Sequence, residues 1–424
     1  MKRKCELLFR RKVLSLFARV RFLGLKPYVI DTSVYWTLIS YRSLFFRFLL
    51  KGRILLQISD IVEWGWIVKK RAEASCDIHR IDSVTYGLCD HFQVLPWELK
   101  LIDGKELEEV ETEYRNRFLF YYQSLVAFNK TSKIQKVIYA QGYVSGADAC
   151  RQFSLRFGVP RLSIENVANK DRILWDDVSG IAVNKTLAKN YYFGYKDIVE
   201  SEFAIKYVRG KIQKIRETKI AEHVSGSKRC DGDNFILFLG QVFTDTSILF
   251  SAEEGWGPIE VIRALKQEST RHGLELQIKL HPKEYAGKSS LAKKMYDSLT
   301  YRKMEAVPGL LDSGIQVDCN NSLDTYDLIK KAALVVTMNS QAGLEAALFE
   351  KPVICCAQSN YSNLGFTLDC RDAKELGLAV SKALGLEPAE RSRLYEHACK
   401  FDYIFNEIYC IPKTIRSFTG KACQ

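Results

Sequence analysis

The sequence predicts an α/β protein made of two Rossmann-like domains that face a central cleft. Short apolar stretches typical of strands alternate with helical patterns through both halves of its 424 residues. A charged, polar stretch at residues 185–232 separates the halves, and the length exceeds what one hydrophobic core usually covers. We therefore expect an N-terminal domain at residues 1–225, a second domain at residues 233–400 and a helical tail at residues 401–424.

The N-terminal segment is basic and rich in aromatic residues. Residues 1–70 contain 15 Lys or Arg and 4 Asp or Glu, so they account for most of the net charge of +12. This concentration argues against a nucleic-acid-binding protein, whose basic residues would extend over its folded domains. No apolar run approaches the roughly 18–20 residues that a membrane-spanning helix needs. Two interpretations remain: a basic helical segment that contacts the membrane surface, or a soluble helical layer with a solvated basic face.

The cysteines indicate a reducing compartment. All 12 are scattered between Cys5 and Cys423 without a CxxC pair, and the Cys and His residues between positions 76 and 91 match no common zinc pattern. We expect reduced thiols in a cytoplasmic protein, with no metal and no cofactor.

The first half contains one clear strand–helix–strand unit. Its parts are an apolar strand at residues 137–140, a helix at residues 147–157 and a strand at residues 161–164. Glu165 follows the second strand directly. Ligands of open parallel sheets bind beyond the carboxyl ends of the strands, so this carboxylate is a candidate site residue. The alternative is a helix cap or a salt bridge within a loop.

The second half opens on an apolar strand at residues 235–239, and polar residues follow its end. Gly240 permits a close backbone approach, while Asp245 and two neighbouring hydroxyl residues supply a carboxylate and hydrogen-bonding groups. A later strand at residues 276–280 runs directly into His281. In a parallel sheet both strand ends lie at the same edge.

His281-Pro282 is the sharpest local signal. The proline disfavours a helical conformation at residue 281 and holds the chain extended as it leaves the strand. The imidazole is thereby presented at the sheet edge, flanked by Lys279 and Lys283. There it can donate to a phosphate oxygen or protonate a leaving group near neutral pH. The simpler alternative is a surface histidine at the end of a strand.

Residues 332–367 form a second candidate part of the same site. We expect a buried strand at residues 333–338, a polar turn at residues 339–343, a helix at residues 344–350 and a strand at residues 353–356. The N terminus of such a helix directs free N–H groups at an anion, and Glu345 can reach the ribose of a nucleotide bound there. An ordinary turn of a doubly wound sheet is the alternative.

Several nucleotide-binding and catalytic motifs are absent from the sequence. A Walker P-loop, a dinucleotide GxGxxG fingerprint and a Gly-x-Ser-x-Gly elbow do not occur. The one DxD sequence, Asp231-Gly232-Asp233, precedes its strand, so we interpret it as a linker and not as a divalent-cation site. Phosphoryl transfer of the P-loop kind and hydride transfer are therefore not favoured.

Five segments of the chain match the pattern of a known family. They are Leu280-His281-Pro282, residues 336–347 (VTMNSQAGLEAA), Lys351-Pro352-Val353, Tyr361 with Gly365-Phe366-Thr367, and the turn at residues 240–247. With these segments the chain resembles the bacterial capsule polysaccharide biosynthesis family, which includes β-Kdo transferases, over roughly residues 135–370. Its layout is similar to that of bacterial sialyltransferases, which also use CMP-activated sugars. The resemblance implies the two-domain GT-B layout, with the acceptor on the first domain and the nucleotide-sugar on the second.

The resemblance also implies which residues bind the nucleotide part of the donor. They are His281, Gln241, Asn339, Ser340, Gln341, Gly343, Glu345 and Tyr361. His281, Ser340 and the N–H groups of residues 341–343 would bind the phosphate and stabilise the departing nucleotide without a metal. Glu345 would hold the ribose, and Tyr361 would line the base or sugar pocket.

Two catalytic carboxylates are implied beside His281. In a retaining reaction, which we favour, Asp245 would be the nucleophile and Glu165 the acid/base, whereas an inverting reaction needs one base. We expect a glycosyltransferase that moves Kdo from CMP-Kdo onto a capsule or lipopolysaccharide glycan, or onto its lipid-linked precursor. The alternatives are a UDP-sugar-dependent transferase or epimerase on the same scaffold, and a non-catalytic nucleotide- or glycan-binding subunit of polysaccharide export.

Overall fold

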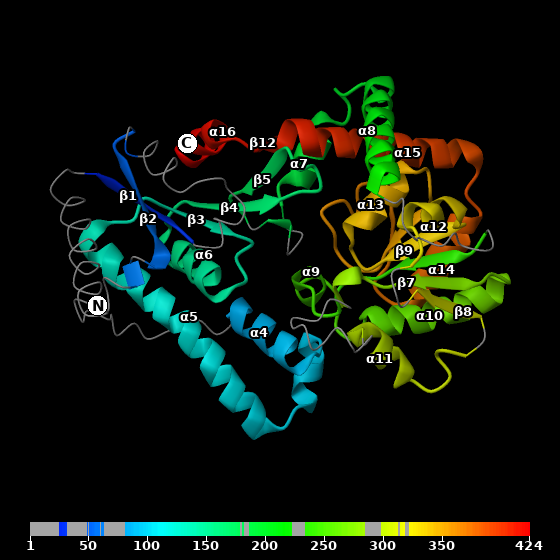
Figure 1. Cartoon of the computed structure of the whole chain (residues 1–424), viewed down its shortest axis with the longest axis horizontal. Helices are drawn as coiled ribbons and strands as arrows, with labels where there is room; N and C mark the ends of the chain where they lie inside the picture. The colour runs from blue at the N-terminus through cyan, green and yellow to red at the C-terminus, as the bar shows by residue number, and fades with distance from the viewer. Residues whose placement is uncertain are drawn as a thin grey trace. The chain divides into compact units, whose positions relative to one another are not determined.

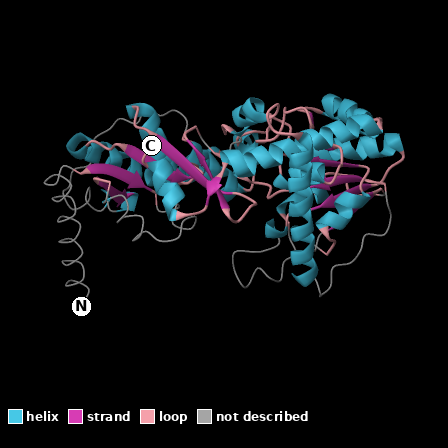
Figure 2. Ribbon diagram, turned by 90° about the horizontal axis from the view of Figure 1, so that it is seen from above, coloured by secondary structure: helices cyan, strands magenta, loops and turns pink. Residues whose placement is uncertain are grey.

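The computed structural model describes most of the chain and divides it into two compact units. The described residues are 25–31, 49, 51–59, 61–62, 81–178, 180–181, 186–222, 234–284, 298–312, 314–318 and 322–424. Unit 1 comprises Met1–Phe92, Glu98–Thr186 and Cys410–Gln424, and unit 2 comprises Gln93–Trp97 and Leu187–Tyr409. Each unit contains a six-stranded sheet with helices packed on it (Figures 1 and 2). The predicted α/β class with two Rossmann-like sheets is confirmed.

The compact units have bounds that differ from the expected domains. The division falls at residues 186–187, ahead of helix α8 (Ser201–Glu222). The boundary expected between residues 225 and 233 lies outside the described residues. Helix α8 packs against the late helix α15 (Pro388–Tyr403), so its interactions assign it to unit 2 and not to the first domain.

The C-terminal residues do not form a separate helical tail. Helix α15 continues into a π-helix at Ile404–Tyr409, and strand β12 (Ile411–Pro412) follows. β12 pairs antiparallel with strand β5 (Arg172–Asp176) of unit 1, and helix α16 (Ile415–Ala422) then packs on the same sheet. The end of the chain is therefore part of unit 1.

The sheet of unit 1 has the strand order β12-β5-β4-β3-β1-β2. Its remaining strands are β1 (Lys26–Ile30), β2 (Arg53–Gln57), β3 (Lys136–Ala140) and β4 (Arg161–Asn166). These four are parallel, and β5 runs antiparallel to β4. The strand order reverses between β1 and β3, because β2 lies on one side of β1 and the later strands lie on the other. Open parallel sheets bind ligands at such a reversal, beyond the carboxyl ends of the strands.

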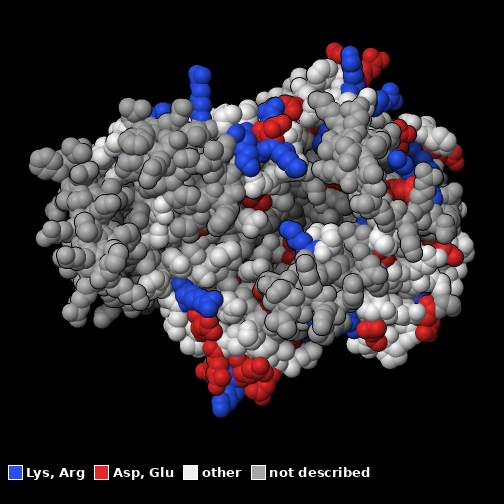
Figure 3. Space-filling model, in the orientation of Figure 1, with Lys and Arg blue, Asp and Glu red and all other residues white. Residues whose placement is uncertain are grey.

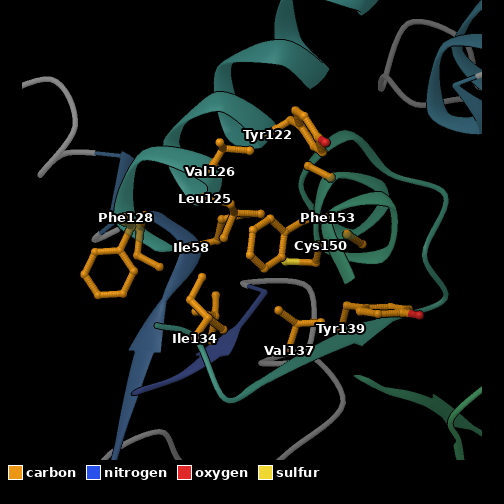
Figure 4. Packing of buried hydrophobic residues seen from close by; sticks show 14 of the residues in the cluster. Ile58, Tyr122, Leu125, Val126, Phe128, Ile134, Val137, Tyr139, Cys150 and Phe153 are labelled. Carbon is orange, nitrogen blue, oxygen red and sulfur yellow. The ribbon is translucent and has the colours of Figure 1, made fainter. Parts of the chain in front are cut away.

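Both faces of the unit 1 sheet are buried. Helices α4 (Asp82–Phe92), α5 (Gly104–Ser132) and α6 (Ser145–Phe157) cover one face, where Val137 of β3 packs with Leu125 and Phe153 (Figure 4). Helix α16 covers the other face, where Phe418 joins Ile138. Full burial of each such side chain contributes about 1.5–3 kcal/mol. Because the strands are buried on both faces, successive residues on either side are apolar, which explains their continuous apolar sequences.

Helix α5 begins at Gly104, directly after a capping residue. Asp103 caps it, because its side chain accepts hydrogen bonds from the N–H groups of Lys105 and Glu106. The acidic first half is exposed, and the buried positions begin at Phe118. The charged half of the helix is therefore solvated, and its apolar half packs on the sheet.

The sheet of unit 2 has the strand order β11-β10-β9-β6-β7-β8, and all of its neighbouring strands are parallel. The strands are β6 (Ile236–Leu239), β7 (Leu276–Lys279), β8 (Ile315–Asp318), β9 (Leu334–Thr337), β10 (Val353–Cys355) and β11 (Leu368–Asp369). The further helices are α7 (Ala188–Tyr195), α9 (Thr246–Leu249), α10 (Pro258–His272), α11 (Leu299–Glu305), α12 (Thr325–Lys331), α13 (Gln341–Leu348) and α14 (Ala373–Leu384). The order reverses between β6 and β9, which predicts a ligand site at the loops that follow these two strands.

The described part of the basic N-terminal segment contributes β1 and β2 to unit 1. Both strands are buried at their centres, and Arg53 of β2 donates from Nε to the hydroxyl of Tyr28 at 2.9 Å. The rest of the expected basic helical segment lies mostly outside the described residues. Among the helices that the structure describes, none combines the length and the apolar character needed to cross a bilayer.

Candidate functional site

Three polar loops meet at the carboxyl edge of the unit 2 sheet. They follow β6, β7 and β9, and β6 pairs with both of the other strands. Gly240 ends β6 so close to β7 that a Cβ atom there would lie 3.3 Å from the carbonyl oxygen of Lys279. The prediction that these strand ends share one edge is therefore confirmed, and the edge coincides with the reversal of strand order.

Asn339, two residues after the end of β9, connects the loop after β9 with the loop after β6. Its buried side chain donates from Nδ2 to the carbonyl oxygen of Ser247 and to Oγ of Ser251, both at 2.8 Å, and its Oδ1 lies 2.9 Å from Oγ of Ser247. Gln241 completes the link, because its Oε1 accepts from the N–H group of Asn339 at 3.0 Å. Both amide side chains are engaged within the protein and hold the loops in position. Their contact with a nucleotide stays a prediction.

Asp245 is held in place by the same network. It caps the short helix α9, and its Oδ1 accepts from the N–H group of Ser247 at 2.8 Å and lies 2.7 Å from Oγ of Ser247. That hydroxyl has one proton to share between Asp245 and Asn339. The carboxylate is half-buried and fixed in orientation, as a nucleophile or an electrostatic stabiliser requires.

His281 lies in the loop after β7, separated from the strand by Leu280. The hydrogen bond of its ring defines which nitrogen carries the proton. Its Nδ1 accepts from the N–H group of Lys283 at 3.1 Å, so in the neutral ring the proton is on Nε2. Burial, together with the charge of Lys283, lowers the pKa of His281 below 6.5, while Asp245 acts in the opposite direction. The neutral imidazole therefore offers an Nε2–H donor near neutral pH, close enough to Asp245 for the two to interact.

Glu284 braces the loop that carries His281, and sequence reasoning missed it. Its Oε1 accepts from the N–H group of Phe243 at 2.8 Å and from Oγ1 of Thr300 at 2.9 Å, and its Oε2 accepts from the hydroxyl of Ser298. The carboxylate thus ties the loop after β6 to the loop after β7. The available signal was a carboxylate three residues beyond the histidine on the same loop.

Lys279 does not flank the imidazole as the sequence suggested. Its buried Nζ donates to Oδ2 of Asp318 and to the carbonyl oxygen of Leu323, each at 2.8 Å. Burial opposes the charge on Asp318, but the hydrogen bonds from Lys279 and two backbone N–H groups outweigh it and hold the pKa of Asp318 below its usual range. This pair supports the β7–β8 edge of the sheet.

The turn after β9 leads directly into α13, which begins three residues earlier than expected. Ser340 is the N-cap, and its Oγ accepts from the N–H group of Ala342 at 3.3 Å. The N–H group of Gly343 donates to the carbonyl oxygen of Ser340 at 2.9 Å. Two of the N–H groups predicted to bind phosphate are thus engaged by Ser340, and Gln341 is the first helical residue.

Tyr361 supports this turn and does not line an open pocket. Its side chain is fully buried, and its hydroxyl donates to the carbonyl oxygen of Ser340. Burial, with the neighbouring Cys355, raises the pKa of Tyr361 well above its usual value. Gly343 is required here, because a Cβ atom at this position would lie 2.4 Å from the Tyr361 hydroxyl.

Glu345 lies on α13 and is half-buried. Its Oε2 accepts from the hydroxyl of Tyr326 at 3.1 Å. Burial and the neighbouring Glu345 carboxylate both raise the pKa of Tyr326, which keeps its hydroxyl protonated as a donor. Sequence reasoning did not identify this partner, which reaches Glu345 from helix α12.

Glu165 belongs to unit 1, whereas the other predicted site residues belong to unit 2. It lies near the end of β4 and is buried, and a Cβ atom at Gly180 would lie 2.4 Å from its Oε1. Gly180 has φ of +107°, so a residue with a side chain would be both strained and obstructed there. The backbone at Gly180 therefore covers this carboxylate closely.

A doubly wound sheet with converging polar loops defines unit 2 as an α/β unit built to bind a small molecule at its strand-order reversal. A family model described as capsule polysaccharide biosynthesis protein matches residues 182–399, which include all of these loops. The match extends over half of the chain, and the chain belongs to this family. No match was found among curated proteins.

Similar chains occur among solved structures. The KpsC β-Kdo 2,4 transferase of Thermosulfurimonas dismutans is 18% identical with a TM-score of 0.42, over 69% of this chain and 88% of that chain. The KpsC β-Kdo 2,7 transferase of the same organism is 14% identical with a TM-score of 0.46, over 91% and 92%. The UDP-GlcNAc 2-epimerase of Methanocaldococcus jannaschii is 12% identical with a TM-score of 0.33, over 85% and 93%.

Proposed function

We propose that the chain is a GT-B glycosyltransferase of surface polysaccharide synthesis, with CMP-Kdo as its donor. The acceptor would be a capsule or lipopolysaccharide glycan or its lipid-linked precursor. Membership of the capsule polysaccharide biosynthesis family supports a role in surface polysaccharide synthesis. The resemblance of the His-Pro and Asn-Ser-Gln-Ala-Gly-Leu-Glu segments to β-Kdo transferases supports the donor.

The observation that carries the proposal is the state of His281. Its Nδ1 accepts from the backbone of Lys283, which places the proton of the neutral ring on Nε2, in the loop after β7, the neighbour of β6. A neutral donor fixed before the reaction stabilises the negative charge that develops on the phosphate as the sugar leaves. Ser340 and the start of α13 would complete the phosphate site, with the N–H group of Gln341 as a donor.

Glu345 would hold the ribose in the proposed complex. Its carboxylate accepts from Tyr326, which fixes its orientation. A carboxylate is the acceptor that the two hydroxyls of a ribose require. Asn339, Gln241 and Tyr361 would act indirectly, because their contacts hold the loops that present the phosphate-binding groups.

In the proposed retaining reaction, Asp245 attacks the anomeric carbon as the bond to the phosphate oxygen breaks and CMP leaves with the bonding electrons. Ser247 holds one carboxylate oxygen, so the nucleophile is oriented beforehand. The acceptor hydroxyl then displaces Asp245, and its proton passes to a base, for which Glu165 is our candidate. In an inverting reaction the acceptor would attack directly and one base would suffice.

Nucleotide binding tests the proposal with three ligands. CMP, UDP and GDP are each added to the full chain, and the thermal unfolding midpoint is recorded as a function of concentration. CMP alone should raise it, since a ligand at 100 times its dissociation constant stabilises the folded state by about 2.7 kcal/mol. Selective stabilisation by UDP would contradict the CMP donor, and no response to any nucleotide would contradict the transferase.

Two histidine variants localise the effect. His281→Ala should lose most of the response to CMP, because the phosphate loses its neutral donor. His272→Ala is the matched control, since His272 ends α10 of the same unit and is not part of the loops at the sheet edge. An equal loss in both variants would contradict the assignment of His281.

We further propose that residues 1–70 bring the enzyme to the cytoplasmic face of the inner membrane. The support is their composition, with 15 Lys or Arg against 4 Asp or Glu and many aromatic residues. Such a segment is attracted by anionic lipids and inserts aromatic groups at the interface. Lipid-linked acceptors would be available there.

A further inference from the structure

The four parallel strands of the unit 1 sheet each begin with a basic residue. Lys26 begins β1, Arg53 begins β2, Lys136 begins β3 and Arg161 begins β4. The pairing places the start of each strand within two residues of the start of its neighbour. Because neighbouring strands lie about 4.8 Å apart, these four residues form a basic row along the amino edge of the sheet.

A cavity of about 670 Å³ lies at this amino edge. Its lining includes Lys136 and Arg161 at the strand starts, Trp175 near the end of the antiparallel strand β5, and Lys421 in the last turn of α16. The proposed acid/base Glu165 lies near the opposite end of β4. The cavity is therefore separate from the carboxyl edge, where doubly wound sheets bind their ligands.

The charge of the lining favours an anion. Its side chains carry three positive charges and one negative charge, that of the exposed Asp177. Nε of Arg161 donates to the carbonyl oxygen of Val178 at 3.4 Å, and Nζ of Lys421 lies 3.9 Å from the centre of the Trp175 ring. These neutral partners hold the two cations in place without neutralising them. The acidic side chains of helix α5 gather where that helix begins and do not line this cavity (Figure 3).

The third cation, Lys136, is half-buried. Burial is the main cause that lowers its pKa below the usual value; Arg53 acts in the same direction, whereas Cys423 and Asp177 oppose it. A bound anion stabilises the charged form of such a lysine. The state of Lys136 therefore agrees with the excess of positive charge in the lining.

Apolar side chains surround the basic lining. Leu155 on α6 is 51% exposed and Val178 after β5 is 40% exposed, and both line the cavity. Phe157, two residues beyond Leu155 at the end of α6, is 43% exposed. Exposed apolar groups beside a set of cations are typical of a surface that meets anionic lipid, because the apolar groups enter the interface while the cations contact phosphate.

We propose that the amino edge of the unit 1 sheet docks on an anionic membrane, with the phosphate of a phospholipid headgroup in this cavity. Lys136, Arg161 and Lys421 would donate to the phosphate oxygens. Leu155 and Val178 would enter the boundary between headgroups and acyl chains. The site goes beyond the contact proposed for residues 1–70, because the residues that line the cavity begin at Lys136.

Co-sedimentation of the full chain with vesicles tests the charged part of the site. The vesicles consist of phosphatidylcholine with or without phosphatidylglycerol, and the wild type should bind those with phosphatidylglycerol. Joint replacement Lys136→Gln and Lys421→Gln should weaken this binding at least about tenfold, since each basic residue near an anionic surface contributes about fivefold. The matched control is Lys374→Gln with Lys382→Gln, which removes the same charge from exposed positions of α14 in unit 2.

The control pair should change the binding by less than about threefold, since its lysines lie outside the cavity. Equal losses in the two pairs would show an effect of net charge alone and overturn the proposal. Unchanged binding in the cavity pair also overturns it, because residues 1–70 or other basic residues would then account for the attraction.

A leucine variant tests the apolar part of the site. Leu155→Ser should weaken binding to the same vesicles at least about fivefold, because the side chain no longer gains from entering the interface. Leu378→Ser is the matched control, since Leu378 is 66% exposed on α14 and should not matter. Both positions are exposed, so this comparison does not depend on the folding of the lysine variants. Unchanged binding in Leu155→Ser overturns the proposal.

Glycerol phosphate distinguishes a membrane site from a site for a soluble phosphate ester. In a calorimetric titration of the full chain we expect no saturable binding at submillimolar concentration. Tight binding that is lost in Lys136→Gln with Lys421→Gln, while vesicle binding is kept, would overturn the membrane assignment. The cavity is lined by residues of unit 1 alone, so these results do not depend on the response to nucleotides. A chain that docks on vesicles and binds no nucleotide upholds this site and refutes the transferase.

Discussion

The contact between Gly343 and Tyr361 makes a quantitative prediction about the turn that begins α13. In Gly343→Ala the added Cβ would lie 2.4 Å from the Tyr361 hydroxyl and 2.8 Å from Cγ2 of Thr337, whereas ordinary contacts are 3.4 Å or longer. The hydroxyl must therefore move by about 1 Å, which ends its hydrogen bond to Ser340. Overpacking costs about 1–3 kcal/mol and the lost hydrogen bond of the buried Tyr361 hydroxyl about 0.5–1.5 kcal/mol, so we expect a loss of roughly 2–4 kcal/mol.

Thermal unfolding of the variants measures this loss. For a unit of this size about 1 kcal/mol corresponds to a shift of roughly 2–4 °C, so the midpoint should fall by about 5–15 °C. Gly210→Ala is the matched control, because Gly210 lies in α8 with no atom near its added Cβ. That variant should be unchanged or more stable by up to about 1 kcal/mol, since alanine favours the helix.

A double-mutant cycle tests the stated cause. Tyr361→Phe removes the hydroxyl and makes room for the Cβ of Gly343→Ala. The double variant should therefore cost at least about 1 kcal/mol less than the sum of the two single variants. Additive costs, or a Gly343→Ala protein as stable as Gly210→Ala, would refute the account of this turn.

Three further predictions concern other parts of the chain. Lys279→Ala should lower stability by about 3–5 kcal/mol in chemical unfolding, because it removes the cation that forms an ion pair with the buried carboxylate of Asp318. The joint change Lys279→Met and Asp318→Leu should cost much less, and equal costs would contradict this. The pKa of His281 is below 6.5 in the folded state, so the unfolded chain binds this proton first and stability falls as the pH drops below about 6.5. His281→Gln should therefore show a smaller fall in unfolding midpoint between about pH 7.5 and 5.5 than the wild type, and an equal fall would exclude this contribution. Finally, the full chain should co-sediment with vesicles containing anionic phospholipid and dissociate at about 1 M salt, while binding equally to neutral vesicles would contradict the electrostatic attraction.

The strand ends could be predicted because their signals are local. A short apolar run followed by Gly240, by His281-Pro282 or by Asn339-Ser340 marks the carboxyl end of a buried parallel strand, and the structure has a strand before each of them. The start of α13 was also encoded locally, since serine is a preferred N-cap, but the polar turn was expected to continue to Gly343. The cap contact from Ser340 to Ala342 is the signal that decides this boundary.

The contacts within the site could not be predicted, because they join residues far apart in the chain. Asn339 bonds to Ser247, 92 positions earlier, and nothing in either local pattern specifies the pairing. Those bonds give this amide a role in positioning the loops that its sequence does not show. The burial of Tyr361 against Ser340 could not be predicted for the same reason, since it depends on the packing of the loop after β10.

The division of the chain into two units also depends on contacts between residues far apart in the sequence. β12 pairs with β5 across more than 200 residues, which returns the C terminus to unit 1. Two short strand residues, Ile411 and Pro412, give too weak a pattern to indicate a strand, and the charged helix α8 looked like the approach to a linker. Sequence composition thus located a boundary region, but the helix pairing of α8 and α15 determines which unit it belongs to.

The release of CMP from CMP-Kdo tests the central claim most directly. The full chain is incubated with CMP-Kdo and a preparation of acceptor glycan, and CMP formed above the spontaneous rate is measured for wild type, His281→Ala, Asp245→Asn and the control His272→Ala. We predict turnover in the wild type and in His272→Ala, and a loss of at least about 100-fold in the other two variants, because each removes a group that stabilises or forms the transition state. Undiminished turnover in His281→Ala and Asp245→Asn would contradict the assignment of the site.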